Sequence, residues 1–344
     1  MIYRSRAPFR IGLAGGGTDV SPYSEDFGGA ILNATINLFA KTSISPREDG
    51  KIIIHAVDRG ERLEFDGLNN LPIDGILDLQ KGIYNRIVKD FNGGKALSFE
   101  LQTHMDVPSG SGLGTSSTLV VSILGAFVEW LNLPLGEYDI AQLAYDIERK
   151  DLKMAGGKQD QYAATFGGVN FMEFDKNDKV IVNPLRVRNE SLLELQHNLI
   201  LFYTKTSRES SKIIETQATN AAGKRERPIA AMHKVKEQAF VMKEAILKNE
   251  LHKIGSTLDN SWKNKKQMAS GISNEVIDSL YETAIKAGAT GGKISGAGGG
   301  GFMIFYCDDS KRYDVIAALE KMGGEVTRYE FNQTGLTTWT TTQK

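Results

Sequence analysis

The chain has 344 residues, of which 41% are hydrophobic and 24% charged, and its formal net charge at pH 7 is -1. At roughly 150 residues per domain, this length predicts two domains with ample buried core. The balance of 41 Lys and Arg against 42 Asp and Glu predicts no nucleic-acid or membrane partner, and the single cysteine, Cys307, excludes an intrachain disulfide.

The first part of the chain is predicted to be mostly strands. Short apolar or alternating runs bounded by turn residues predict strands at residues 9–14, 51–57, 62–65 and 96–105. Between the last two of these, the spacing of Leu79, Ile83, Ile87 and Phe91 predicts a helix. Arg4, Arg6, Pro8 and Arg10 interrupt the N-terminus before an apolar signal segment could form, and no later run reaches membrane-spanning length, so we expect a cytoplasmic protein.

Residues 107–118, VPSGSGLGTSST, are the most informative stretch. Three glycines and several hydroxyl side chains precede an apolar-striped segment running from Leu119 to Leu131, which predicts a flexible loop leading into a buried helix. The free amides of a first helical turn carry a partial positive charge, so such a loop favours phosphate. The stretch lacks the GK[ST] ending of a Walker A loop.

The rest of the chain alternates helices, strands and glycine-rich turns. Ile140, Leu143, Ala144 and Ile147 predict a helix with Glu148 beside its apolar face. Paired glycines bracket Asp160 within residues 154–168. Strands are predicted at residues 168–175, 197–205, 302–307, 325–331 and 336–341, helices at 229–247, 251–267, 274–287 and 313–322, and a glycine-rich loop at 291–301.

Together the residues resemble the GHMP small-molecule kinases, the family of galactokinase, homoserine kinase and mevalonate kinase. The first family motif matches residues 10–19, the second residues 108–117 and the third residues 293–301. Three motifs in family order are far more specific than any one of them. The resemblance implies a two-domain α+β fold, with an N-terminal domain (residues 1–190) like ribosomal protein S5 domain 2 and a ferredoxin-like C-terminal domain (residues 191–344).

The resemblance also implies an ATP-dependent phosphotransferase with Mg²⁺. Asp160 matches the family's catalytic aspartate and Arg10 the basic residue that pairs with it. Ser116 and Glu148 would hold Mg²⁺, which is satisfied by one or two protein oxygens together with phosphates and water. The residues expected to bind the nucleotide phosphates are Pro108, Gly110, Ser111, Gly112, Leu113, Gly114, Thr115, Ser116 and Ser117.

The acceptor is expected to be a sugar phosphate. Galactokinases carry a glutamate and a histidine where this chain has Gly16 and Gly17, whereas residues 10–23 resemble the D-glycero-D-manno-heptose 7-phosphate kinases. That resemblance implies transfer of the γ-phosphate of ATP to the anomeric hydroxyl, giving the 1,7-bisphosphate of GDP-heptose biosynthesis. The residues expected at the substrate are Gly17, Thr18, Asp19, Lys158 and Arg208.

Other functions stay open at this point. The same fold could phosphorylate fucose or galactose, decarboxylate a phosphorylated acid with ATP, or sense sugar and nucleotide without turnover. The GxGxxG of Gly296, Gly298 and Gly301 would suit a dinucleotide enzyme, but a strand and not a helix follows it. A homodimer is also left open, and the scattered histidines predict no zinc site.

Overall fold

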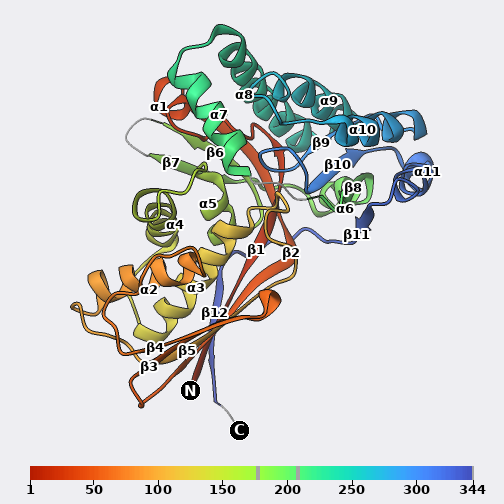
Figure 1. Cartoon of the computed structure of the whole chain (residues 1–344). Helices are drawn as coiled ribbons and strands as arrows, with labels where there is room; N and C mark the ends of the chain where they lie inside the picture. Colours follow the sequence, from red (N-terminus) through yellow and green to blue (C-terminus); the bar gives the residue numbers. More distant parts are fainter. Residues whose placement is uncertain (176–178, 207–209, 343–344) are drawn as a thin grey trace.

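The computed structural model describes residues 1–175, 179–206 and 210–342, which form two β-sheets covered by helices (Figure 1). The first sheet contains β1 (Ile2–Ala14), β2 (Gly29–Pro46), β3 (Lys51–Ala56), β4 (Glu61–Asp66), β5 (Phe99–Met105), β6 (Val169–Phe174), β7 (Val180–Pro184) and β12 (Thr337–Thr341). The second contains β8 (Leu199–Tyr203), β9 (Gly291–Ile294), β10 (Phe302–Tyr306) and β11 (Glu325–Thr327). Among the described residues, none of the helices has the length and apolarity needed to traverse a bilayer.

The helices are mostly longer in the second half of the chain. In order they are α1 (Tyr23–Phe27), α2 (Asp78–Phe91), α3 (Thr115–Leu131), α4 (Glu137–Asp146), α5 (Gln159–Phe166), α6 (Asn189–Asn198), α7 (Ser210–Ala222), α8 (Glu226–Leu247), α9 (Ile254–Lys265), α10 (Glu275–Ala287) and α11 (Asp309–Glu320). Short 3-10 turns, η1 (Val57–Arg59) and η3 (Leu251–Lys253), and a π-helical turn, η2 (Ile147–Asp151), connect some of them.

The first sheet has the strand order β12-β1-β2-β5-β3-β4, and β6 joins β2 to β7. Its longest strand is β2, whose first eight residues are all buried. The sequence does not predict β2, because its first eight residues are buried on both faces and show no alternation, and Ala and Asn, which have low strand propensity, recur along it. β2 nevertheless pairs with β1, β5 and β6 and so connects the sheet.

Helix α3 fixes the position of the phosphate-binding candidate loop. It packs on β1 and β2 and is bordered by α2, α4 and α5. Leu119, Val120, Ile123, Leu124 and Phe127 are buried in the main hydrophobic core. Because this helix is buried on most sides, its N-terminus cannot shift without disturbing the core.

The second sheet has the order β11-β8-β10-β9, with every adjacent pair antiparallel. Counted within this half, that order is the 4-1-3-2 arrangement of a ferredoxin-like fold, as the resemblance implied. Helix α9 packs on β9 and against α8, and α10 packs on α11. A second hydrophobic core, which includes Trp262, Phe202 and Phe305, lies between this sheet and its helices.

The two halves are joined by more than one covalent connection. After β11 the chain returns to the first sheet, where β12 pairs antiparallel with β1 as an edge strand in the lower part of Figure 1. On the way, Asn332 N donates to Thr35 O at 2.8 Å and Leu336 N donates to Thr165 O at 3.0 Å. The domain division at residues 190 and 191 stays a proposal, and the last strand lies in the sheet of the N-terminal half.

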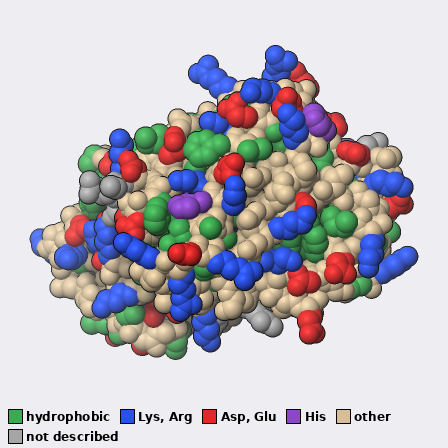
Figure 2. Space-filling view, turned by 90° about the horizontal axis from the view of Figure 1, so that it is seen from above, with side chains coloured by type: hydrophobic (Ala, Val, Ile, Leu, Met, Phe, Trp, Pro, Cys, Tyr) green, Lys and Arg blue, Asp and Glu red, His purple; other side chains and the backbone are tan. Residues whose placement is uncertain are grey.

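Most predicted elements are found, with shifted ends. The helix predicted at residues 274–287 is α10, ended by Gly288 with a φ of 119°. The first four residues of the predicted glycine-rich loop form the strand β9, because their backbone pairs with β10. Helices α6 and α7 were not predicted. On the face seen from above, acidic and basic side chains are interspersed (Figure 2).

Candidate active site

The loop before α3 turns sharply at its glycines. Gly110, Gly112 and Gly114 have φ values of 72°, 84° and 78°, a region that residues with a Cβ rarely occupy. Gly114 is the N-cap of α3, so the free amides of the first turn face the space beside the loop. This is the arrangement that the sequence predicted for a phosphate site.

Arg10 and Asp160 form an ion pair next to this loop. Arg10 Nε and Nη2 both lie 2.7 Å from Asp160 Oδ1, and Arg10 Nη1 donates to Gly112 O at 2.8 Å. The guanidinium is almost fully buried, whereas 22% of the Asp160 side chain is exposed. The sequence-predicted pair is therefore brought together by β1 and α5, with its carboxylate open to the adjoining cavity.

Asp19 holds the helix that carries Asp160. Its Oδ2 accepts hydrogen bonds from Lys158 N at 2.9 Å and Gln159 N at 3.0 Å, at the N-terminus of α5. A Cβ on Gly157 would lie 1.9 Å from the same oxygen, so only glycine fits there. Burial raises the pKa of the Asp19 carboxyl above its usual range, although the bond from Gln159 N opposes that shift.

Glu148 is fully buried on the π-helical turn η2, not on a solvated helix face. Gln161 Nε2 donates to Glu148 Oε2 at 2.5 Å and to Ser117 Oγ at 3.0 Å. Arg149 Nη1 lies 3.5 Å from Glu148 Oε1, an oxygen without a hydrogen-bond partner in the described part of the chain. The carboxylate is thus held beside the first turn of α3 with one oxygen available.

These groups line one cavity of about 530 Å³. Its floor is the loop before α3, one wall is η2 with the turn that follows it, and the other comes from α7 and the third motif. The predicted residues that line it are Arg10, Gly110, Gly112, Gly114, Thr115, Ser116, Ser117, Glu148 and Asp160. The tertiary structure therefore gathers residues from five separate segments around one space.

The third motif packs on the second. Phe302 N donates to Ser111 O at 2.9 Å, and Ser295 Oγ donates to Gly112 O at 3.1 Å. A Cβ on Gly296 would lie 2.7 Å from Gly112 O, so the two loops touch backbone to backbone. The second half of the chain supports the phosphate-binding candidate loop directly.

The other predicted site residues lie around the cavity or away from it. Gly17 and Asp19 line a smaller pocket of about 60 Å³ that adjoins Asp160. Thr18 Oγ1 is buried, donates to Gly15 O and accepts from Ala30 N. Lys158 Nζ pairs with Glu25 Oε1 at 3.0 Å, and its side chain is only 2% exposed.

Three residues of the loop that were predicted to bind phosphate do not line the cavity. Leu113 belongs to the hydrophobic core, Ser111 is fully buried, and Pro108 is exposed. None of the three is among the described residues that line the cavity. Arg208, the last predicted substrate ligand, lies outside the described residues.

Two buried lysines also approach the site. Lys265 Nζ donates to Gly296 O at 2.5 Å, and Lys293 Nζ donates to Gly12 O at 2.6 Å. Burial and the nearby Arg10 guanidinium lower the pKa of Lys265 to about 8, whereas the Asp19 and Asp160 carboxylates oppose that shift. Burial, Lys265 and Arg10 lower the pKa of Lys293 well below its usual range.

Sequence reasoning missed Lys265 and also Gln217, which both line the smaller pocket. A signal existed for each of them. Lys265 continues the buried stripe of Leu258 and Trp262 on α9, and Gln217 continues that of Ile213 on α7. A polar residue in an apolar stripe is a candidate for a buried site.

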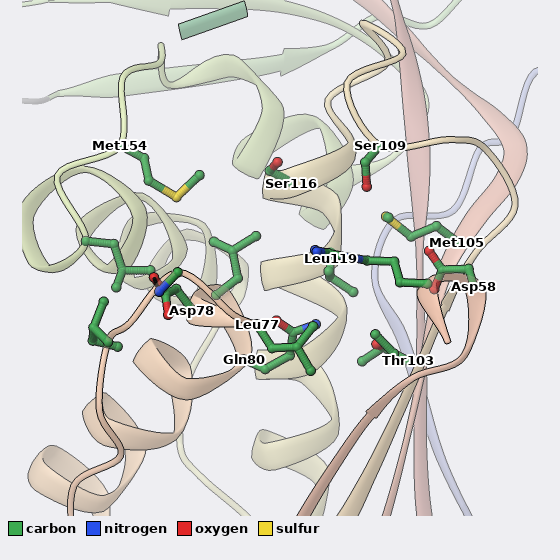
Figure 3. A pocket seen from close by; sticks show the side chains of 16 residues that line it. Asp58, Leu77, Asp78, Gln80, Thr103, Met105, Ser109, Ser116, Leu119 and Met154 are labelled. Atoms are coloured by element: carbon green, nitrogen blue, oxygen red, sulfur yellow. Dashed lines mark hydrogen bonds between the residues drawn. The ribbon is translucent and has the colours of Figure 1, made fainter. Parts of the chain in front are cut away.

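A second pocket of about 370 Å³ adjoins the cavity at Ser109, Ser116 and Met154. Figure 3 shows its side chains around a common space between the start of α2, the first turns of α3 and the end of β5. Leu77, Met105 and Leu119 give it apolar walls, and Asp78 and Gln80 add polar groups. A mostly apolar pocket with a few polar groups suits a heterocyclic base.

Comparison with known families agrees with this geometry. The profile of the GHMP kinases N terminal domain matches residues 78–168, and that of the GHMP kinases C terminal domain matches residues 242–325. D-glycero-alpha-D-manno-heptose 7-phosphate kinase of Campylobacter jejuni is 50% identical to this chain over 336 residues, which are 98% of each protein. The chain therefore belongs to the GHMP kinase family.

Solved structures extend the comparison. A D-glycero-D-manno-heptose 1-phosphate kinase from Bacteroides thetaiotaomicron is 43% identical and superposes with a TM-score of 0.84 over 99% of this chain and 100% of its own. Galactokinase of Lactococcus lactis, 21% identical, shares the fold over 98% of this chain and 95% of its own, with a TM-score of 0.77. The chain is a phosphotransferase that uses ATP, and it is related to sugar kinases over nearly its whole length.

Gly112→Ala should disturb the loop more than an ordinary glycine replacement. Its Cβ would lie 2.5 Å from Ser295 O, and its φ of 84° adds backbone strain. We expect about 2 kcal/mol or more of lost stability and at least a tenfold weaker ATP affinity. Gly323→Ala is the matched control, because φ is 93° there and nothing lies within 4 Å of the added Cβ. Equal effects on ATP affinity, measured by calorimetry, would contradict the expectation.

Lys265→Met should stabilise the fold at neutral pH. The pKa of Lys265 falls from 10.5 to about 8 on folding, so the charged form is disfavoured in the folded state. The gain should be about 3 kcal/mol below pH 8 and should fade between pH 8 and 10.5. In that range the folded lysine is neutral, and the cost of deprotonating the unfolded lysine falls to zero near pH 10.5. Urea unfolding at several pH values measures this. The control is Lys266→Met, at an exposed neighbouring position, which should change stability little. A gain from Lys265→Met that does not depend on pH would show that the lowered pKa of Lys265 is not its cause.

Proposed function

We propose that this chain is a sugar kinase that transfers the γ-phosphate of ATP to a hydroxyl of a heptose phosphate. The observation that carries the proposal is the position of Asp160. Its carboxylate lies between the glycine-lined cavity and the smaller polar pocket, and it borders both. A group in that position can contact the acceptor hydroxyl while the phosphate donor occupies the larger cavity.

ATP fits the pocket of Figure 3 and the glycine-lined cavity end to end. The nucleoside would occupy the pocket of Figure 3, and the phosphates would lie against the backbone amides of Gly110, Gly112 and Gly114. The residues shared by the two pockets, Ser109, Ser116 and Met154, would lie at the junction of ribose and phosphates. The N-terminus of α3 adds its partial positive charge at the phosphate end.

The residues present also fit Mg²⁺. Glu148 is a buried carboxylate whose Oε1 accepts no hydrogen bond from the described residues, and it is linked to Ser117 through Gln161. Glu148 and the hydroxyl of Ser116 are the groups that we propose as ligands, in agreement with the preference of Mg²⁺ for hard oxygens. Bound together with ATP, the ion would neutralise charge on the phosphates.

Asp160 is proposed to receive or orient the proton of the attacking hydroxyl. The oxygen of that hydroxyl forms the new bond to the γ-phosphorus, the bond from phosphorus to the β-bridging oxygen breaks, and ADP leaves. Arg10 holds Asp160 through Oδ1 and is itself held by Gly112 O, so the carboxylate is oriented before substrate arrives. The buried cations Arg10 and Lys265 would stabilise the charge that develops nearby.

The acceptor is proposed to be D-glycero-D-manno-heptose 7-phosphate, phosphorylated at the anomeric hydroxyl. The 50% identity to the Campylobacter jejuni kinase over 98% of both chains supports this choice. One solved relative is described as a heptose 1-phosphate kinase, so a second possible acceptor is the same heptose with its phosphate at position 1. A kinase for fucose or galactose on the same fold is the alternative.

An acceptor panel tests the substrate. We expect ADP release from ATP and Mg²⁺ with D-glycero-D-manno-heptose 7-phosphate, and at least a hundredfold lower kcat/KM with mannose, fucose, galactose and mevalonate, which lack its phosphate and side chain. Heptose 1-phosphate is included as a separate arm. The proposal is wrong if the 7-phosphate is inert while another acceptor turns over.

Asp160→Asn tests the mechanism. The amide keeps the shape of the side chain but cannot take a proton, so we expect kcat to fall by about 10²- to 10⁴-fold while ATP affinity changes by less than about threefold. Asp66→Asn, an exposed change at the end of β4, is the control and should leave both constants unaltered. Near-normal turnover of Asp160→Asn would exclude its role as base.

A further inference from the structure

The smaller pocket beside Asp160 is built by both halves of the chain. Asp19 and Gln159 come from the N-terminal half, and Gln217 from α7 and Lys265 from α9 come from the C-terminal half. Gln217 and Lys265 are each 2% exposed. Nearly all of the polar surface that an acceptor would meet here is therefore hidden from bulk solvent.

Gly16 and Gly17 leave room that the C-terminal half fills. A Cβ on Gly16 would lie 3.5 Å from Lys265 Nζ, and a Cβ on Gly17 would lie 3.2 Å from Gln217 Oε1 and 2.7 Å from Met268 Cε. Gly17 also has a φ of 101°. These are the positions at which galactokinase-like sequences carry a glutamate and a histidine. In this chain, Lys265 Nζ lies next to the position that a Cβ of residue 16 would take, and Gln217 Oε1 lies next to that of residue 17.

Two buried polar atoms in this pocket have no partner among the described residues. They are Gln217 Nε2, a donor, and Gln159 Oε1, an acceptor. Buried amide groups are rarely left unpaired, because the lost hydrogen bonds to water are not replaced. Lys265 Nζ has three hydrogens, and the structure shows one of them bonded, to Gly296 O. An unpaired donor and an unpaired acceptor thus belong to residues that line the same small pocket.

We propose that Gln217 and Lys265 determine acceptor specificity by binding oxygens of the sugar, in place of side chains at positions 16 and 17. The Gln217 amide donates to a hydroxyl oxygen, Gln159 Oε1 accepts from a hydroxyl, and the Lys265 ammonium donates to a further oxygen. A ligand with adjacent hydroxyls satisfies this set, whereas an isolated alcohol does not. The proposal rests on the proposed sugar kinase function.

The pocket holds only part of a sugar, because its volume is about 60 Å³. It opens into the larger cavity through shared walls that include Arg10, Asp160 and Ile214. Ile214 lies one helical turn before Gln217 on α7, so the two side chains share one face of that helix. The enclosed part of the ligand is therefore the part nearest the reacting hydroxyl.

The test compares Gln217→Leu and Gln217→Asn with the wild-type enzyme. Leucine removes the amide at similar volume, and asparagine withdraws the same amide by one methylene. We expect kcat/KM for the acceptor to fall roughly 10- to 100-fold in both, mainly through KM, while KM for ATP changes less than about twofold. Gln267→Leu makes the same replacement at an exposed position of the segment after α9 and should leave both constants unchanged.

Monodeoxy analogues of the acceptor distinguish direct binding by Gln217 from a purely structural role of that residue. In the wild type, removing the hydroxyl that Gln217 binds should lower kcat/KM by about tenfold or more, and in Gln217→Leu the same removal should have little further effect. Equal losses for every analogue in both proteins would overturn the proposal, as would unchanged acceptor kinetics. Thermal unfolding confirms that the variants fold.

The same data separate this proposal from the proposed function. The assays use whichever acceptor of the panel the wild type phosphorylates. If that is a sugar other than the heptose phosphate, the substrate assignment fails while the effect of Gln217→Leu still decides its role. If the heptose phosphate is the substrate and Gln217→Leu is unaffected, only the present inference fails.

Discussion

The site depends on the hydrogen bonds that the Arg10 guanidinium donates to the Asp160 carboxylate and to Gly112 O. Two nitrogens of the buried Arg10 side chain hold the proposed catalytic carboxylate, and the third donates to the loop before α3. Since a guanidinium is planar and always charged, it fixes direction as well as distance. The first motif, the second motif and α5 are thereby kept in one arrangement. Removing this residue would leave the Asp160 carboxylate and the Gly112 carbonyl oxygen without this partner at the edge of the cavity.

The two halves of the chain contribute different kinds of groups to the site. The N-terminal half supplies Glu148 and the backbone amides around Gly110 and Gly114, which we propose bind the triphosphate of ATP. The C-terminal half supplies Gly296, whose backbone contacts Gly112, and the side chains of Gln217 and Lys265 near Asp160. Backbone contacts tolerate change in the surrounding sequence, whereas side-chain contacts can be altered one by one.

Buried charge is the energetic cost of this arrangement. Arg10, Lys265 and Lys293 lie close enough for their charges to oppose one another, and burial adds to that penalty. Asp19 is buried as well and carries the opposite charge, but its Oδ2 is occupied by the N-terminus of α5. The surrounding structure tolerates the charges because α3 and the sheets are well packed, and because β12 ties the end of the chain to β1. Sites that bind several negative charges commonly carry such a penalty until the ligand arrives.

The sequence alone predicted the glycine loop, the buried helix behind it, most strands and the order of the family motifs, because these are local patterns of spacing and turn chemistry. It did not predict β2, since the first eight residues of that strand are buried on both faces and show no alternation. It also could not show that Glu148 is buried beside Ser117, nor that Gln217 and Lys265 approach Gly17 and Gly16. Those contacts join residues far apart in the chain, so only the packing of two sheets and their helices decided them.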